Sequence, residues 1–128
     1  ELRAGDSVME VASNDGYLLQ FFHRAGLKVL GVEPARNVAA AARERGIPTV
    51  SHFFGTQVAE TLVREHGQPR LLIANNVVAH VPDINDFFGG LRTLLAPDGT
   101  LMAVPVTAAG ASIVTVAGPN LPTTMPAA

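Results

Sequence analysis

The sequence contains no cysteine, few charged residues and no long apolar run. Without cysteine this chain forms neither a disulfide nor a thiolate zinc site. Charged residues make up 16% of the chain and the formal net charge is −2, which argues against a nucleic-acid surface built on bulk positive charge. No apolar run approaches the ~18 residues of a membrane span, and no signal peptide is evident. We therefore expect a cytoplasmic protein with no nucleic-acid and no membrane partner.

The composition indicates one globular domain. The chain has 128 residues, of which 48% are hydrophobic, and this is enough to bury a sizeable core. It begins with Glu1 rather than methionine, so we expect a piece of a longer protein whose flanking domains are missing. Beyond Val106 the composition changes to alanine, threonine, glycine and proline. We predict a core over residues 1–106 and a tail over residues 107–128, in which residues 112–116 could add an edge strand before a disordered end.

Short apolar runs alternate with helical patterns along the chain. The predicted strands cover residues 7–11, 27–33, 48–50, 70–75 and 100–104. The predicted helices cover residues 17–26, 36–45, 57–66 and 82–95, the last one weakened at Gly89-Gly90. This alternation predicts βαβ units with right-handed crossovers, and therefore an α/β, Rossmann-like fold whose mainly parallel sheet has helices on both faces.

Aromatic residues and histidines are assigned by their spacing. The pairs Phe21-Phe22 and Phe87-Phe88 stand at core positions of their helices, so we expect them to pack in the core. His23, His52 and His66 lack a setting that indicates a function, and we expect them at the surface.

The turn at residues 12–16, ASNDG, joins the first strand to the first helix. In open α/β sheets such a turn builds a ligand crevice at the carboxyl ends of the strands. We expect Asn14 or Asp15 to cap the helix, and Gly16 to leave room for a backbone to approach a ligand. Glu33 ends the second strand ~20 residues further on, where a ribose-binding carboxylate is expected. The alternative is that Glu33 is a solvated strand end.

The same turn has too few glycines for a pyrophosphate. A dinucleotide site requires G-x-G-x-x-G, a phosphate loop requires G-K-[ST], and neither occurs. A ligand with ribose and adenine but without phosphates would fit, and S-adenosylmethionine is such a ligand. Its amino group and its sulfonium would suit the nearby Glu10 or Asp15. Because an unpaired carboxylate inside a strand is unfavourable, Glu10 either faces this cofactor or bonds the backbone amides of the turn.

The chain resembles the class I S-adenosylmethionine-dependent methyltransferases in four segments: VMEVASNDGYLL, VLGVEPA, LLIANNVVAHVPD and LLAPDGTLMAVP. More narrowly it resembles the C-methyltransferases that act on nucleotide-linked deoxy-keto-sugars, whose first motif reads E-x-A-S-N-D-G in place of the usual glycine-rich form. The resemblance covers about residues 5–106. It implies a class I methyltransferase fold, a small-molecule substrate such as a nucleotide sugar, and chemistry that needs no metal.

The resemblance also implies roles for individual residues. The methionine end of the cofactor would be lined by Ala12, Ser13, Asn14 and Gly16. The ribose would be bound by Glu33, and the adenine would lie near Pro34, Phe53 and Phe54. Beside the methyl group, at the carboxyl end of the fourth strand, would lie Asn75 and Asn76. His80 would face the sugar, and His80 and Asn76 would be the catalytic residues. The alternative is that His80 is a structural residue that bonds to the backbone.

The chain departs from this family in two features. It has no cysteines for the family's N-terminal zinc-binding domain, and after Val106 it lacks the Y-H-E-H segment that carries the base, together with the C-terminal domain that follows. We therefore expect the cofactor-binding core of a C-methyltransferase with its catalytic half missing or replaced. A non-catalytic domain that binds the cofactor, or nothing, is one alternative. An NAD-dependent oxidoreductase is another, although the missing glycines and Asn75-Asn76 count against it.

Overall fold

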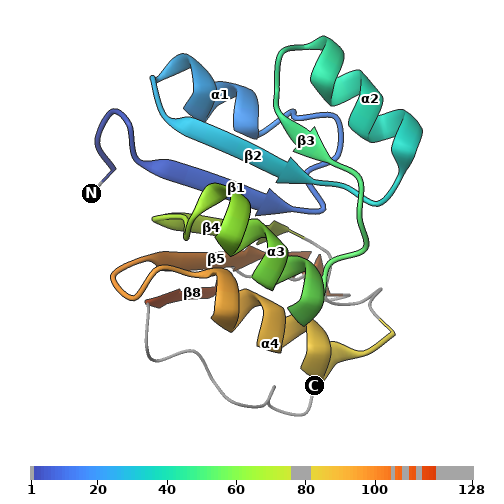
Figure 1. Ribbon diagram of the computed structural model, residues 1–128, viewed down its shortest axis with the longest axis vertical. Helices are drawn as coiled ribbons and strands as arrows, with labels where there is room; N and C mark the ends of the chain where they lie inside the picture. Colours follow the sequence, from blue (N-terminus) through green and yellow to red (C-terminus); the bar gives the residue numbers. More distant parts are fainter. Residues whose placement is uncertain (1, 76–81, 105, 108–109, 112–113, 118–128) are drawn as a thin grey trace.

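A six-stranded sheet with the strand order β3-β2-β1-β4-β5-β8 forms the centre of the fold (Figure 1). The computed structural model describes residues 2–75, 82–104, 106–107, 110–111 and 114–117. The sheet consists of β1 (Ser7–Val11), β2 (Lys28–Val32), β3 (Thr49–Val50), β4 (Leu71–Asn75), β5 (Thr100–Val104) and β8 (Val114–Ala117). The helices are α1 (Leu19–Arg24), α2 (Arg36–Glu44), α3 (Thr56–His66) and α4 (Ile84–Leu94). A separate antiparallel pair joins β6 (Val106–Thr107) to β7 (Gly110–Ala111).

The strands β1 to β5 pair in parallel, which confirms the predicted fold class. The last strand, β8, pairs antiparallel with β5 and forms an edge of the sheet close to the residues where an edge strand was expected. It extends the pairing of the main sheet beyond residue 106. None of the helices in the described ranges is long and apolar enough to cross a membrane.

Side chains of the central strands alternate between two apolar clusters. Val8 of β1 and Ile73 of β4 pack with residues from α1 and α2 on one face of the sheet. Met9 of β1 and Leu72 of β4 pack with residues from α3 and α4 on the other face. Because both faces are covered, these strands appear in the sequence as continuous apolar runs rather than as alternating patterns.

The aromatic pairs are less buried than their spacing predicted. Phe87 is 1% exposed and lies in the core, as expected, whereas Phe21 is 52% exposed, so its assignment to the core is wrong. Helix α1 has only six residues, and neighbouring residues on a helix point about 100° apart, so Phe22 turns toward the sheet and Phe21 does not. Phe21 instead makes an edge contact with Tyr17, whose ring centroid is 6.1 Å away.

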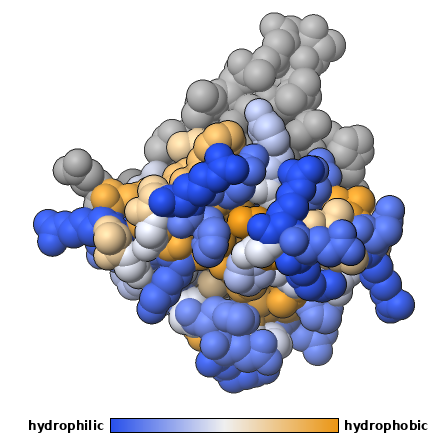
Figure 2. Space-filling model, turned by 90° about the horizontal axis from the view of Figure 1, so that it is seen from above, coloured by the Kyte–Doolittle hydropathy of each residue, from blue (hydrophilic) through white to orange (hydrophobic). Residues whose placement is uncertain are grey.

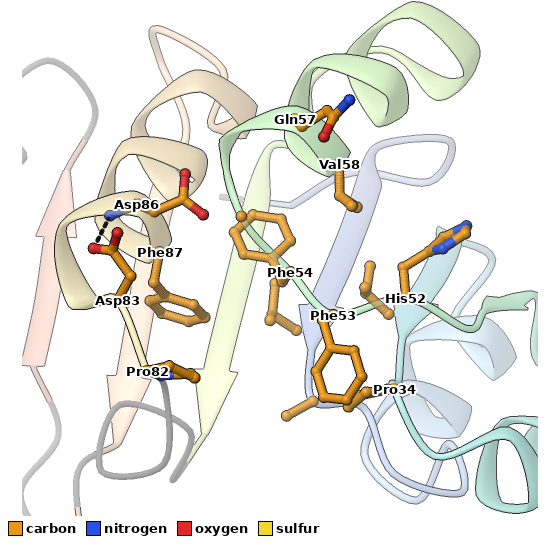
Figure 3. A pocket seen from close by; sticks show the side chains of 14 residues that line it. Pro34, His52, Phe53, Phe54, Gln57, Val58, Pro82, Asp83, Asp86 and Phe87 are labelled. Carbon is orange, nitrogen blue, oxygen red and sulfur yellow. Dashed lines mark hydrogen bonds between the residues drawn. The ribbon is translucent and has the colours of Figure 1, made fainter.

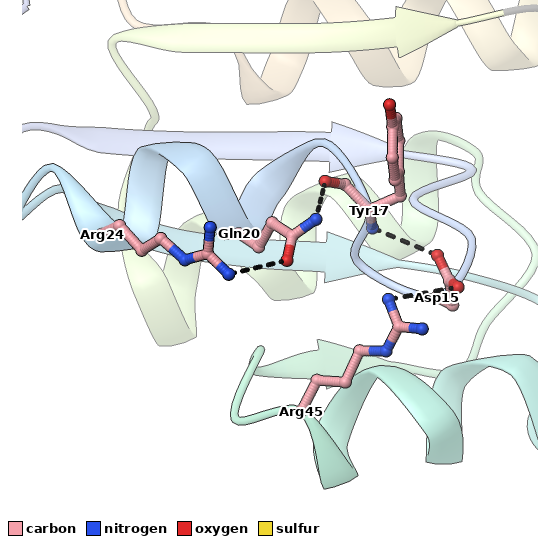
Figure 4. Close-up of polar contacts among 5 residues, drawn as sticks. All are labelled: Asp15, Tyr17, Gln20, Arg24 and Arg45. Atoms are coloured by element: carbon pink, nitrogen blue, oxygen red, sulfur yellow. Dashed lines mark hydrogen bonds and ion pairs between the residues drawn. The ribbon is translucent and has the colours of Figure 1, made fainter.

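The expected side-chain cap of the first helix is absent. Leu18 stands at the N-cap of α1 and no side chain bonds the helix end. Asp15 accepts a hydrogen bond from the backbone N–H of Tyr17 at 3.2 Å, inside the turn, and lies 3.4 Å from Arg45 (Figure 4). Gly16 to Leu18 continue the turn before the helix begins, so Asp15 and Asn14 lie too far back to cap it. Asp15 therefore connects the turn to the end of α2.

The helices α3 and α4 lie side by side on one face of the sheet (Figure 1). Their close approach depends on Gly90, because a Cβ atom there would lie 2.8 Å from the ring of Phe54. Helix α4 runs through Gly89-Gly90 without a break, so the expected weakening does not end it. Its first turn is capped by Asp83, which accepts from the N–H of Asp86 at 3.0 Å.

Asp86 connects the beginnings of α3 and α4. Its carboxylate accepts from the N–H of Thr56 at 3.1 Å, and the Thr56 hydroxyl donates to the Asp86 carbonyl at 3.2 Å. The residue at the N-cap of α3 is Gly55, which has no side chain to do this, so Asp86 supplies the cap from another helix.

We expect Asp86→Ala to lower the free energy of unfolding by about 1 kcal/mol, because a lost N-cap has roughly this effect. Denaturant unfolding of the variant measures it. The exposed Glu60→Ala on α3, which removes a carboxylate that caps nothing among the described contacts, is the matched control and is expected to change stability by less than about 0.5 kcal/mol. Equal losses in both variants would contradict the proposed cap.

Candidate functional site

The carboxyl ends of β1 and its two neighbours are where this topology places a ligand. Strand β1 lies between β2 and β4. The strands β2 and β3 extend the sheet on one side of β1, and β4 and β5 extend it on the other side. Open α/β sheets bind ligands in the crevice at such a switch point. Around this one the structure brings together a pocket, a strained turn and two buried glutamates.

The pocket has a volume of about 670 Å³ and lies on the face of the sheet that α3 and α4 cover (Figure 3). Its walls come from the ends of β1 and β2, from the connection between β3 and α3, and from the first turns of α3 and α4: Val11, Ala12, Val32, Pro34, His52, Phe53, Phe54, Gly55, Gln57, Val58, Pro82, Asp83, Asp86 and Phe87. This size is typical of small-molecule and cofactor sites.

Aromatic rings form much of the apolar wall. Phe54 and Phe87 meet edge to face with ring centroids 5.5 Å apart. Phe53 is 83% exposed, and Figure 3 shows it on the same side of the pocket as Pro34. A large exposed aromatic side chain at the rim of an apolar pocket suits a flat ligand ring, which would bury it.

Polar side chains of the pocket were missed from the sequence. His52 is exposed, as expected, but it also lines the pocket, as do Gln57, Asp83 and Asp86. Three of these four stand within the first turns of α3 and α4 or at their caps. Polar residues at the start of a helix that begins beside the carboxyl ends of the strands could therefore have predicted them. No cluster of three or more metal-ligating side chains occurs in the part of the chain that the structure describes.

In the turn after β1, two residues other than glycine have a left-handed backbone conformation. Ala12 and Asn14 have positive φ angles of 60° and 57°, in the left-handed region that residues other than glycine rarely adopt. The N–H of Ala12 donates to the carbonyl of Val32 at 2.8 Å, and this bond fixes the turn against β2. Gly16 has a φ of 81°, and the space for a Cβ atom there is filled by Ile47 at 2.9 Å, not left open as expected.

We expect Ala12→Gly to stabilise the chain by roughly 0.5–1 kcal/mol. Relief of the left-handed strain is worth about 1–2 kcal/mol, and the greater freedom of glycine in the unfolded chain offsets part of it. The same change at Ala40, exposed in the middle of α2, is the matched control and is expected to destabilise by about 1 kcal/mol. Thermal and denaturant unfolding measure both, and a loss of stability at both positions would contradict the strain.

Glu33 is 9% exposed, so the alternative of a solvated strand end is wrong. One carboxylate oxygen accepts from the N–H of Asn14 at 3.0 Å, and the other accepts from the N–H of Ala35 at 2.8 Å. These bonds fix the carboxylate between the turn and the start of α2. Each oxygen has a second lone pair, so the group can still accept hydrogen bonds from two ligand hydroxyls.

Glu10 is 4% exposed in the middle of the sheet, and its Oε1 has no hydrogen-bond partner among the described residues. Burial, and secondarily the nearby charge of Glu33, raise its pKa to about 8. Glu33 accepts from the amide of Asn14, and Val32 accepts from the amides of Ala12 and Ser13, so the described bonds do not support Glu10 as their partner.

Ser13 shares this environment. Its hydroxyl is buried without a described partner and lies over Gly31 of β2, where a Cβ atom would overlap it. Gly31 pairs with Glu10 in the register of the sheet. The two unsatisfied oxygens, from Glu10 and Ser13, therefore belong to one polar region beneath the turn.

The predicted site residues fall into two groups on opposite faces of the sheet. The pocket, beside α3 and α4, contains four of them: Ala12, Pro34, Phe53 and Phe54. The polar region, beside α1 and α2, consists of Glu10, Ser13, Asn14 and Glu33. Asn75 ends β4 at the same edge, and Asn76 and His80 lie outside the described residues. The groups meet at the carboxyl ends of β1 and β2.

This geometry agrees with a match between the chain and a methyltransferase domain family over residues 1–116. The chain belongs to this methyltransferase family. Among curated relatives it is 44% identical over 98 residues to C-methyltransferase NovU of Streptomyces niveus, an alignment that covers 77% of this chain and 23% of NovU. It is 32% identical over 102 residues to a ubiquinone biosynthesis O-methyltransferase of Nitrobacter winogradskyi, covering 78% of this chain and 38% of that protein. The chain thus spans less than half the length of these relatives.

Solved structures of methyltransferases have the same fold. The TehB-like S-adenosylmethionine-dependent methyltransferase of Corynebacterium glutamicum superposes with a TM-score of 0.70 at 14% identity, over 85% of this chain and 59% of that one. The predicted class I fold and the resemblance to methyltransferases are thereby confirmed.

Proposed function

We propose that this chain is the cofactor-binding domain of a methyltransferase that methylates a carbon atom of a nucleotide-linked keto-sugar. The observation that supports a carbon acceptor is the 44% identity to a C-methyltransferase, against 32% to an O-methyltransferase of similar alignment length. The sugar comes from the resemblance of the S-N-D-G and A-N-N-V-V-A-H segments to nucleotide-sugar enzymes. The cytoplasmic location and the division into residues 1–106 and 107–128 remain predictions.

The residues present fit S-adenosylmethionine. The apolar pocket with Phe53, Phe54 and Pro34 would take the adenine, and the Glu33 carboxylate would accept both ribose hydroxyls. The unsatisfied oxygens of Glu10 and Ser13 would lie toward the methionine end, which carries positive charge. With Asn14, Gly16 and Asn75 these residues make up the proposed cofactor site. When bound, the cofactor supplies an electrophilic methyl group.

The proposed catalytic residues act on the sugar. A neutral His80 imidazole, whose ordinary pKa lies near the working pH, would take the proton from the carbon beside the keto group or orient that carbonyl. Asn76, which follows Asn75 in the sequence, would orient the reacting groups. Fixing two reactants in one geometry contributes much of the rate in such reactions, so alignment is the main task of this domain.

A second candidate is O-methylation, which the ubiquinone biosynthesis relatives favour. Proton exchange distinguishes the two reactions. C-methylation requires the loss of a C–H proton beside a keto group, so the enzyme should exchange that proton with deuterium from solvent when the keto-sugar is present. O-methylation requires no such exchange.

The cofactor is tested by calorimetric titration of the chain with S-adenosylmethionine, with NAD as a control ligand. We expect saturable binding of S-adenosylmethionine, no binding of NAD, and at least a tenfold weaker affinity in Phe54→Ala, since that ring forms part of the pocket wall. The exposed Phe21→Ala on α1 is the matched control and should bind as the unmodified chain does. Binding of NAD alone would support an oxidoreductase, and binding of neither ligand would support a domain without cofactor function.

A further inference from the structure

Glu10 is a buried residue of β1, the strand that lies between β2 and β4 in the sheet. In the register it pairs with Gly31 of β2 on one side and with Ile73 of β4 on the other. The side chain is 4% exposed, and Val8 and Ile73 on the same face are fully buried in the apolar cluster beside α1 and α2. One residue further along, β1 ends at the pocket. A buried carboxyl group this close to the carboxyl ends of the strands affects the binding of a ligand there.

No positive group compensates Glu10 within the described chain. Its Oε1 has no hydrogen-bond partner, and the charged group that acts on it is another carboxylate, Glu33. Asp15, in the turn, is paired with Arg45. The other charged side chains of the elements packed against β1 are exposed: His23, Arg24, Lys28, Arg36, Arg43 and Glu44. Arg70, at the far end of β4, is paired with Asp98 at 3.0 Å. An ionised Glu10 would therefore be unfavourable in the unliganded protein.

A cationic ligand reverses this balance. S-adenosylmethionine has two positive groups, an ammonium and a sulfonium, and either one near the carboxyl end of β1 would attract the Glu10 carboxylate in a water-poor environment where such attraction is strong. The neutral carboxyl group offers no such attraction. The ligand and the proton thus compete for the same side chain.

We propose that binding of the positively charged cofactor displaces the proton of Glu10, so that binding and proton release are one coupled event. This inference rests on the proposed function and describes the control of that same site by pH. The O–H bond of the Glu10 carboxyl group breaks, its electron pair stays on the carboxylate beside the ligand cation, and the proton passes to the buffer. Glu10 is thus neutral before binding, and after binding the positive group of the ligand balances its negative charge.

Calorimetry in buffers of different ionisation enthalpy measures the released protons. With the chain at pH 7 we expect between roughly 0.5 and 1 proton to be released per S-adenosylmethionine bound, and the affinity to rise up to about fifty-fold between pH 6 and pH 8. In Glu10→Gln, a neutral isostere, both the release and the pH dependence should disappear. The difference between the two proteins removes any proton that the ligand itself exchanges. S-adenosylhomocysteine, which lacks the sulfonium, identifies the cation: equal release assigns the ammonium, and release with S-adenosylmethionine alone assigns the sulfonium.

A second measurement needs no ligand. NMR titration of the ¹³C-labelled carboxyl groups of the unliganded chain should show one glutamate, absent in Glu10→Gln, that titrates several pH units above an ordinary glutamate. Ligand binding with no proton release, or a Glu10 that titrates in the ordinary range, would overturn the coupling while leaving the cofactor assignment intact. Absence of any binding heat, with Glu10 titrating high, would instead overturn the proposed function and with it the coupling.

Discussion

Glu10→Gln is expected to raise the free energy of unfolding by roughly 3–5 kcal/mol above pH 8 and to leave it nearly unchanged below pH 4, at ~1.4 kcal/mol per pKa unit. Burial raises the pKa of Glu10 from 4.5 to about 8 in the folded chain. Below pH 4.5 the group is protonated in both states and contributes no difference. As the pH rises from 4.5 to 8, the unfolded chain loses this proton while the folded chain keeps it, so stability falls. Glutamine has no proton to lose, and the fall disappears.

Denaturant unfolding of both proteins between pH 4 and pH 9 measures this difference, because all other titrating groups cancel in the comparison. Glu44→Gln, on the exposed side of α2, is the control and should shift stability by less than about 0.5 kcal/mol at every pH. If the difference between Glu10→Gln and the unmodified chain stays flat across the range, the carboxyl group is not buried in neutral form.

Glu33→Ala is expected to lower the free energy of unfolding by roughly 2–4 kcal/mol, since it leaves two backbone N–H groups without an acceptor. These are the amides of Asn14 and Ala35, which donate to its two oxygens at 3.0 and 2.8 Å. The loss falls on a turn whose backbone is already strained at Ala12 and Asn14. The same variant should remove most of the affinity for S-adenosylmethionine, because the proposed ribose contact is lost.

Glu33→Gln separates the two effects. Its amide oxygen can still accept from one of the two N–H groups, so about half of the lost stability should return. Removal of the negative charge should also lower the pKa of Glu10, because Glu33 contributes to raising it. Hydrogen exchange at Asn14 and Ala35, unfolding by denaturant and the carboxyl titration of Glu10 measure the three effects. Unchanged exchange at both amides in Glu33→Ala would show that its carboxylate does not fix the turn.

The strands could be predicted because each is a short apolar run that ends at proline, glycine or a polar residue. The ends of β1 and β5 agree with the prediction, and those of β2 and β4 differ by one residue at most at either end. Continuous apolar runs such as residues 71–74 also indicated a sheet covered on both faces. The position of Glu33 after β2 was enough to predict a functional carboxylate, although not the amides that it binds.

The remaining features depend on contacts between residues far apart in the sequence. Asp86 caps α3 across thirty positions, and no local pattern reveals a cap that comes from another helix. The sequence of the turn showed only that glycines were missing, whereas the structure retains left-handed backbone at Ala12 and Asn14, because bonds to β2 enforce it. Phe21 was wrongly predicted to lie in the core, and the place of His52 in the pocket wall was missed. Both errors have the same cause, because neighbours in space determine which residues are exposed and which line a pocket.

The division of the predicted site between the two faces of the sheet has a mechanical consequence. The ligand would cross the edge of the sheet, with its ring system beside α3 and α4 and its charged end beneath the β1–α1 turn. Such a ligand would connect the two apolar layers, which lie on opposite faces of the sheet. Its binding should therefore slow the local opening of both layers together, so that amides of α4 and of the β1–α1 turn gain protection from exchange in the same proportion.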